Sequence, residues 1–400
     1  MKLFSEEMLR DPYPFYEHYR RQSPLALDPG QKMWMLFDYE GVKRVLGDPE
    51  NFSSNVAPPS GKPLDWLVFA DPPRHTRLRT IFTRAFMPKS VSSFEPRIRE
   101  VSRELINRDI ERGEMDLIAR YAGPFPSMVI ADIIGIPAAD QPTFLVWNEV
   151  LQNFSSAMLG SQPGSQVNYQ QLSRHAKIQA QMSAYLADLL AQRRRVPRDD
   201  LLTRLGTAEA DGEQPTDSEI MGFIQLLFSA ATETSTNLIG NTVLTFIEHP
   251  EQLARLRADP GLLTSAVEEM LRFRSPIQTL VRQTRRPVEI NGRTLPEGSY
   301  VFAVLGAANR DAKVFAQPQR FDIGRDPNPH IAFGYGAHYC MGLQLGKLEA
   351  RIAIQDLFEN LQDIRLESST PWEPQKAQHV LGAARLRICF KPARKVSVRP

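Results

Sequence analysis

Residues 333–342 read FGYGAHYCMG, and this stretch decides which fold the chain adopts. It places Cys340 after a glycine-rich loop and at the start of a predicted amphipathic helix. Gly334, Gly336 and Gly342 let the backbone approach a flat, bulky partner without side-chain collision. Free N–H groups at a helix N-terminus lower the pKa of a nearby thiol and stabilise the thiolate. The stretch therefore predicts that Cys340 is an anion that ligates or attacks.

The composition is that of a globular chain able to bury a large core. Of its 400 residues, 42% are hydrophobic and 24% are charged. Its 48 Lys and Arg against 46 Asp and Glu give a formal net charge of +2, so no strong field favours nucleic acid or membrane as a partner. The two cysteines, Cys340 and Cys389, exclude a disulfide framework and a cysteine-rich zinc site. We therefore expect a reducing, cytoplasmic location, and interpret Cys389 as a small core residue.

The organisation favours one domain over residues 1–400, mainly α with small β-sheets. The N-terminus turns acidic before any apolar stretch develops, and no apolar run approaches the roughly 18 residues of a membrane span. There is no Gly/Ser linker and no repeat of fixed period. Helical periodicity dominates from about residue 90 to 275, and Asn291-Gly292 signals a hairpin further on.

One helix is predicted to cross the whole domain. Thr216 and Glu219 form a capping-box pattern and Pro250 follows the far end, so residues 217–248 predict a helix of roughly 48 Å. Its flanks are apolar, yet residues 232–237 read TETSTN. Polar groups at the centre of a buried helix cost stability unless something uses them. The plain alternative is that the hydroxyls bond back to carbonyls one turn earlier.

The stretch at residues 333–342 meets the pattern F-x-x-G-x-x-x-C-x-G in full, and in this the sequence resembles a cytochrome P450, a haem-thiolate monooxygenase. The resemblance implies the cytochrome P450 fold, a single prism-like domain with a long central helix over the haem. It also implies haem b, with Cys340 as the axial ligand of the iron.

Two further motifs match this family. Glu269 and Arg272 fit its E-x-x-R motif, and Arg320 would complete a buried Glu-Arg-Arg cluster that supports the cysteine loop. As a lone pattern such a pair would carry little weight. Glu233 and Thr234 fit the acid-alcohol pair of the oxygen-activation segment, and the resemblance makes them the catalytic residues. The family's usual glycine is replaced by Ala231, whose Cβ narrows the groove beside them and puts the usual helix distortion in question.

Four residues match the family's contacts to the haem propionates, which need cations or hydrogen-bond donors inside a protein. They are His75, Arg79, Arg282 and His338.

The resemblance implies that one oxygen atom of O2 is inserted into a substrate C–H bond, an EC 1.14 type of reaction giving hydroxylation or epoxidation. Since the motifs already span residues 71 to 342 and no G-x-G-x-x-G follows a strand, we expect electrons from outside, from a ferredoxin and its reductase as in soluble bacterial members. Arg77 and Lys347 are candidates for the docking patch, although both could be ordinary solvated charges. We expect a monomer that binds neither nucleic acid nor membrane.

The resemblance implies a substrate pocket walled by the loops at residues 51–72 and 158–168 and by three later segments. Its walls are overwhelmingly apolar, which accepts a fatty acid, terpenoid, steroid or macrolide and specifies little. The predicted lining residues are Leu64, Trp66, Leu67, Val68, Phe69, Phe154, Met158, Phe223, Leu227, Ala230, Ile277, Leu280, Val380 and Leu381.

Other functions remain open at this point. A peroxide-driven peroxygenase would not need Glu233 and Thr234, so these two residues count against it. A haem-thiolate isomerase or dehydratase is compatible with the motifs. A non-enzymatic haem sensor would leave the oxygen-activation residues without a purpose. A cysteine hydrolase built on Cys340 and His338 fails, because neighbours two residues apart do not orient a thiolate and a base together.

Overall fold

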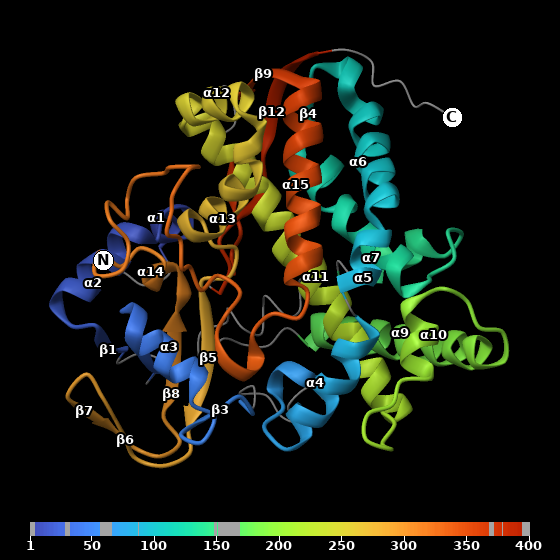
Figure 1. The fold of residues 1–400 in the computed structure, drawn as a ribbon, viewed down its shortest axis with the longest axis horizontal. Coiled ribbons are helices and arrows are strands. Elements are labelled where there is room, and N and C mark those ends of the chain that lie inside the picture. The colour runs from blue at the N-terminus through green and yellow to red at the C-terminus, as the bar shows by residue number, and fades with distance from the viewer. Residues whose placement is uncertain are drawn as a thin grey trace.

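The structure, a computed structural model, describes residues 5–28, 33–56, 66–86, 88–147, 150, 169–367, 372–377 and 379–393. Helices dominate it (Figure 1). They include α1 (Glu6–Arg10), α2 (Tyr13–Gln22), α3 (Tyr39–Gly47), α4 (Arg74–Ala85), α5 (Pro88–Ser93), α6 (Glu95–Asp109), α7 (Pro124–Ile134), α9 (Tyr169–Arg195), α10 (Leu201–Gly206), α11 (Asp217–Glu248), α12 (Pro250–Ala258), α13 (Leu263–Phe273), α14 (Leu305–Ala308) and α15 (Leu343–Asn360). Short 3₁₀ or π turns connect some of them: η1 (Leu67–Phe69), η2 (Ile110–Arg112), η3 (Ile118–Ala122), η4 (Pro260–Leu262) and η5 (Gly336–His338).

The strands form small sheets at the edges of the helical body (Figure 1). The largest has the order β1-β2-β8-β5-β3, in which β2 and β8 are parallel and the other pairs antiparallel. A second has the order β4-β12-β9, and two are pairs, β6-β7 and β10-β11. The strands are β1 (Leu25–Asp28), β2 (Met33–Leu36), β3 (Phe52–Ser53), β4 (Glu114–Asp116), β5 (Thr279–Thr284), β6 (Val288–Ile290), β7 (Arg293–Leu295), β8 (Tyr300–Val304), β9 (Leu361–Leu366), β10 (Glu373–Pro374), β11 (Ala383–Arg385) and β12 (Arg387–Pro392).

The predicted long helix is confirmed as α11, with both of its ends as expected. The Thr216 hydroxyl accepts from the Glu219 N–H at 3.2 Å, and the Glu219 carboxylate accepts from the Thr216 N–H at 3.0 Å, closing the capping box. The helix packs against α7, α15 and η3 and is buried on most sides. It therefore forms the axis of the helical core.

The predicted hairpin is also confirmed, because β6 and β7 pair around Asn291 and Gly292. Both turn residues have positive φ, 48° and 73°, as a two-residue type I′ turn requires.

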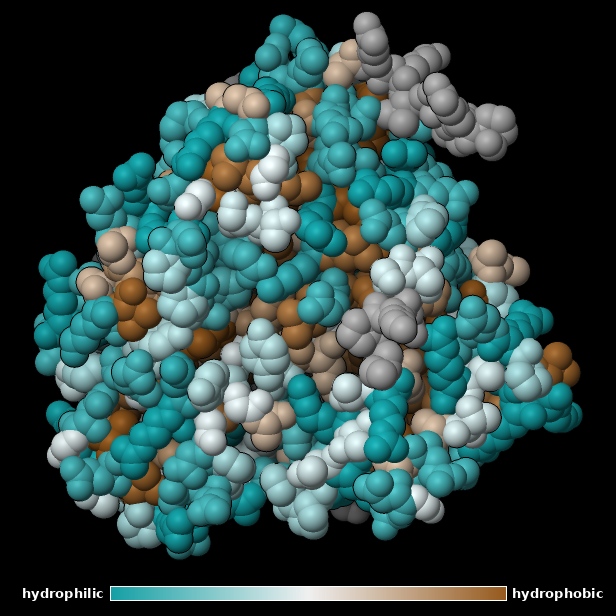
Figure 2. All heavy atoms as spheres, viewed as in Figure 1, coloured by the Kyte–Doolittle hydropathy of each residue, from teal (hydrophilic) through white to brown (hydrophobic). Residues whose placement is uncertain are grey.

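The apolar side chains gather in one main cluster around α6, α7, α11 and α15 and in two smaller ones beside the five-stranded sheet. On the outside, Figure 2 shows polar residues over most of one face, with hydrophobic side chains between them toward its middle. Among the described residues, no helix is long and apolar enough to span a bilayer.

Candidate functional site

The loop before α15 is closed by its own backbone. The N–H of Cys340 donates to the Phe333 carbonyl at 3.0 Å, and Gly334 and Gly336 take positive φ values of 76° and 74°. A Cβ on Gly336 would lie 2.7 Å from the carbonyl oxygen of Leu46. The glycine at 336 is thus required by the packing of the loop on α3, not by the approach of a flat partner.

The sequence predicted a lowered pKa for the Cys340 thiol, and the structure corrects this. Burial raises the pKa, which the N–H of Gly342 and the charge of Arg79 offset only in part. The helix α15 begins at Leu343, so Cys340 lies before its first turn rather than in it. A metal ion bound at this sulfur would displace the thiol proton and hold the sulfur as the anion.

The centre of α11 carries the predicted acid-alcohol pair on an unbroken helix. The Thr234 hydroxyl donates to the Ala230 carbonyl at 2.7 Å, and the Thr232 hydroxyl does the same to Phe228 at 2.8 Å. Ala230 is exposed although α11 is otherwise largely buried, so the helix is open to solvent at this position. The helix is regular through Ala231, which agrees with the expectation that alanine there disfavours a local distortion.

The four predicted propionate contacts come together from three elements. His75 and Arg79 lie on α4, Arg282 on β5 and His338 in η5, and the two imidazole rings lie 3.9 Å apart between centroids. Burial lowers the pKa of His75 to about 4 and that of His338 to about 3, and their cationic neighbours add to both shifts. Both imidazoles are therefore neutral at pH 7, and Arg79 and Arg282 supply the positive charge.

Comparison with known proteins identifies the family. A sequence profile of the cytochrome P450 family matches residues 26–390. The chain is a cytochrome P450. It is 36% identical over 362 residues to the putative cytochrome P450 YjiB of Bacillus subtilis, with 90% of each chain covered. It is also 36% identical to the vitamin D(3) 25-hydroxylase of Pseudonocardia autotrophica, with 91% of this chain and 90% of the relative covered.

A solved structure agrees with the sequence comparison. CYP109E1 from Bacillus megaterium in complex with corticosterone has a TM-score of 0.87 and 34% identity, over 96% of this chain and 99% of that one. Cytochromes P450 bind haem b, and the relatives of this chain include hydroxylases and an epoxidase. The protein is thus an oxidoreductase of the monooxygenase type.

The residues present fit a haem. Arg282 is 6% exposed, and burial lowers its pKa to about 10. The buried Nε2 of His75 finds no hydrogen-bond partner in the described part of the chain. The nearby Asp71 carboxylate is held 2.6 Å from Arg285 and accepts from Ser53 and Ser54. The buried Arg282, the partly exposed Arg79 and an imidazole without a partner, with little negative charge beside them, suit the two carboxylates of haem. Elsewhere, no cluster of His, Cys, Asp or Glu in the described ranges would hold a metal ion.

The structure corrects one member of the predicted Glu-Arg-Arg cluster. Glu269 and Arg272 are fully buried and paired at 2.7 Å, as predicted. The third cation is Arg325, whose Nε lies 3.1 Å from the Glu269 carboxylate. Arg320 points outward with 61% of its side chain exposed, and only its carbonyl takes part, by accepting from Arg272 and Arg325. Gln317 has a left-handed φ of 46°, which turns the chain just before Arg320.

Both predicted docking cations are engaged in ion pairs within the chain. Arg77 lies 2.5 Å from Glu219 and so ties α4 to the start of α11. Lys347 lies 2.7 Å from Glu268 and sits over the ring of Phe333. The side chains keep only 31% and 26% of their surface exposed.

The predicted pocket residues divide into three groups. Three of them lie in the apolar core clusters: Leu67 and Phe223 in the main one, where Phe223 stacks on Phe82 with centroids 4.1 Å apart, and Leu381 with Tyr13 beside the sheet. Leu64, Phe154 and Met158 lie outside the described residues. Of the predicted residues, Leu67 and Val380 are buried and Ala230 is exposed. Six more are partly buried: Trp66, Val68, Phe69, Leu227, Ile277 and Leu280.

Sequence reasoning missed His379. Its Nε2 lies 3.9 Å from the Glu233 carboxylate, and both side chains are largely buried. The signal available was an imidazole in an otherwise apolar stretch, residues 379–383.

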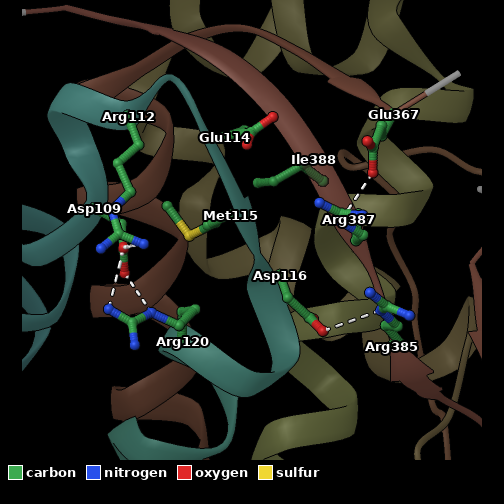
Figure 3. A pocket seen from close by; sticks show the side chains of 10 residues that line it. All are labelled: Asp109, Arg112, Glu114, Met115, Asp116, Arg120, Glu367, Arg385, Arg387 and Ile388. Carbon is green, nitrogen blue, oxygen red and sulfur yellow. Dashed lines mark hydrogen bonds and ion pairs between the residues drawn. The ribbon is translucent and has the colours of Figure 1, made fainter. Parts of the chain in front are cut away.

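A separate cleft of about 230 Å³ lies between η2, β4 and β12 (Figure 3). Its charged side chains pair with one another: Arg120 contacts Asp109 at 2.7 Å, and Arg387 lies 2.8 Å from Glu367. Four arginines and four acids line it, so its charge is balanced. We interpret the cleft as a structural ion-pair network that joins α6 to the edge sheet.

Proposed function

We propose that this cytochrome P450 inserts one oxygen atom of O2 into a C–H bond of a hydrophobic small molecule, by hydroxylation or epoxidation. The observation that carries the proposal is the partly exposed Glu233-Thr234 pair beside the exposed Ala230 on α11, in a chain whose cysteine loop also fits a haem. Bound through Cys340, haem would supply the oxygen activation.

The roles of the chain's own residues follow from their positions. The Thr234 hydroxyl donates its proton to the Ala230 carbonyl, so its oxygen is left to accept a hydrogen bond from a proton donor. Glu233 supplies the carboxylate that exchanges protons with the interior. The buried Arg282 and the imidazole of His75 would hold carboxylates. A peroxide-driven reaction needs no such acid-alcohol pair, which favours the monooxygenase.

For the substrate we propose a rigid polycyclic compound of the steroid class. The similar protein CYP109E1 is described in complex with corticosterone and with testosterone, and another relative is a vitamin D(3) 25-hydroxylase. The stacked rings of Trp66 and Phe69 offer a flat apolar surface that suits such a molecule.

For the electron donor we propose an external ferredoxin and its reductase. We further propose that the protein is a cytoplasmic monomer. The two free cysteines, with no disulfide between them, support the reducing compartment.

The proposal is tested by spectral titration and product analysis. We expect steroids to shift the ferric protein to high spin and, with a ferredoxin-reductase pair and NAD(P)H, to give products heavier by one oxygen atom. The reduced carbon monoxide complex should absorb near 450 nm, and Cys340→Ser should abolish that band while Cys389→Ser keeps it. Turnover without reductant would instead show an isomerase, and turnover with peroxide alone a peroxygenase.

A further inference from the structure

The Glu233 carboxylate has a specific neighbour from the C-terminal part of the chain. The Nε2 of His379 lies 3.9 Å from its Oε2, with side-chain exposures of 14% for His379 and 16% for Glu233. At this separation the contact is electrostatic rather than a formed hydrogen bond. Inside a protein, where solvent screens charges only weakly, such an electrostatic contact still has an appreciable energy.

The segment that carries His379 is held rigidly on both sides. The carbonyl of His379 accepts from the N–H of Gln278 at 2.8 Å, and the N–H of Leu381 donates to the carbonyl of Pro276 at 2.8 Å. Between them, Val380 forms a β-bridge with Ile277. A side chain mounted on such a backbone ladder is well placed to orient another group.

The same segment lies along one polar stripe of α11. Glu233, Asn237 and Asn241 are spaced four residues apart and so share a helix face. The side-chain amide of Asn241 donates to the Leu381 carbonyl at 2.9 Å. A Cβ on Gly382 would lie 2.1 Å from the side-chain oxygen of Asn237, so the backbone rests directly on that residue.

This interface holds polar atoms that a merely structural contact would avoid. Both amide atoms of the fully buried Asn237 and the Nδ1 of His379 find no hydrogen-bond partner in the described part of the chain. Each buried polar group that is left without a hydrogen bond costs about 1–3 kcal/mol of stability. An apolar residue at position 379, like Val380 and Leu381 beside it, would avoid that cost.

We propose that His379 is a positioning residue for Glu233, which holds the carboxylate in the orientation that serves Thr234. Nδ1 is buried, and Nε2 is the ring nitrogen that lies 3.9 Å from the carboxylate, so the tautomer with its hydrogen on Nε2 places the N–H on the atom nearest Oε2. The burial of Nδ1 also argues against a direct contact of that atom with substrate. The inference rests on the proposed monooxygenase function and adds a residue to it.

The test compares His379→Leu with His379→Gln, which keeps an N–H near the position of Nε2. We expect His379→Leu to lower product formed per NAD(P)H by about tenfold, as loss of a partner that orients a catalytic group commonly does, and to raise peroxide release. Substrate-induced spin shift and KM should stay unchanged, and His379→Gln should restore most of the product yield. His249→Leu is the matched control, because His249 also lies near a glutamate, at 3.6 Å from Glu251, but at the far end of α11.

A second readout does not depend on turnover. Thermal unfolding of the four proteins of a double-mutant cycle between His379→Leu and Glu233→Gln reports their coupling. We expect the change of Tm caused by His379→Leu to differ between the unsubstituted protein and the Glu233→Gln background, because the two side chains are coupled. Additive changes of Tm, or a product yield unchanged in His379→Leu, would overturn the inference. Failure of the proposed function looks different: the unsubstituted protein would then lack the 450 nm band or form no product, while the thermal cycle would still report the pair.

Discussion

Thr234 combines two roles that the sequence presents as alternatives, a hydrogen bond back to the helix backbone and a part in the chemistry. Its hydroxyl bonds back to the Ala230 carbonyl, as the plain interpretation has it, and the same bond leaves the oxygen lone pairs directed away from the helix. The hydrogen bond to the Ala230 carbonyl therefore orients the Thr234 hydroxyl and leaves its oxygen able to accept a hydrogen bond.

Removal of this hydroxyl should separate binding from chemistry. We expect Thr234→Ala to bind haem and substrate normally and to lower product per NAD(P)H by at least roughly tenfold, since a methyl group cannot hold a proton donor. Parallel measurement of NAD(P)H, peroxide and product checks this. Thr234→Ser, which keeps a hydroxyl, is the control. An unchanged yield in Thr234→Ala would remove the residue from the mechanism.

Glu349 is a buried acid for which the described residues supply no ion pair to stabilise its charged form. It lies on α15 with 1% exposure, accepts from the Ser235 hydroxyl at 2.6 Å, and its Oε1 has no hydrogen-bond partner in the described residues. Burial raises its pKa to about 8, more than the Ser235 hydrogen bond lowers it. The folded protein thus holds a proton near pH 7 that the unfolded chain releases.

The free energy of unfolding should therefore fall as pH rises. Between the unfolded pKa of 4.5 and the folded value of about 8, the folded state binds more protons, so its stability declines across that window and levels off above it. We expect Glu349→Gln to remove this decline. At pH 9 the free energy of unfolding of the variant should exceed that of the unsubstituted protein by on the order of a few kcal/mol. Urea unfolding at pH 5 and pH 9 measures it. Glu359→Gln, exposed on the same helix, is the control, and an equal decline in Glu349→Gln would contradict the assignment.

At the scale of the element, the support of the cysteine loop depends on Arg325. Its guanidinium bonds the fully buried Glu269 and also donates to the carbonyls of Ala316 at 2.7 Å and Arg320 at 3.0 Å. It therefore joins α13 to the path that leads into the loop.

This contact gives a direct comparison of two arginines. We expect Arg325→Ala to lower the free energy of unfolding by about 3–5 kcal/mol, because it leaves a buried carboxylate short of a partner. Arg320→Ala should change it by less than about 0.5 kcal/mol, as an exposed side chain does. Urea denaturation of both variants decides. Equal losses of the free energy of unfolding in the two variants would show that Arg320, too, belongs to the Glu269-Arg272 cluster.

The elements with local signals were predictable, and those set by long-range backbone paths were not. The capping box at Thr216 and the Asn291-Gly292 turn act within a few residues, so α11 and the hairpin followed from the sequence. The choice between Arg320 and Arg325 depends on the left-handed Gln317, in a stretch without periodicity. His379 reaches Glu233 only because its segment pairs with residues 276–278, about a hundred positions earlier in the chain.

At the scale of the molecule, the site is assembled from segments that meet only in the folded chain. The cysteine loop, α4, β5, α11 and the 379–382 segment each contribute residues to it. The motif positions predicted which residues belong together, because each motif is local. The direction of the Cys340 pKa shift was not predictable, since burial is a property of the whole fold.

The buried Arg282 makes the stability of the molecule depend on haem. A guanidinium this deeply buried, with its pKa lowered to about 10, destabilises the chain unless an anion reaches it. We expect Arg282→Met to leave the Tm of the haem-free protein unchanged or higher. The same substitution should lower the Tm and the haem content of the loaded protein, because a ligand stabilises only the state that binds it.

Calorimetry of both forms, with haem per chain from absorbance, checks this prediction. Arg286→Met, on an exposed side chain next to the same strand, is the control and should alter neither form. A methionine that lowers the Tm of the haem-free protein as much as that of the loaded one would show that Arg282 acts through its contact with the Val281 carbonyl instead. The difference between the two forms, rather than either Tm alone, isolates the interaction of the arginine with the cofactor.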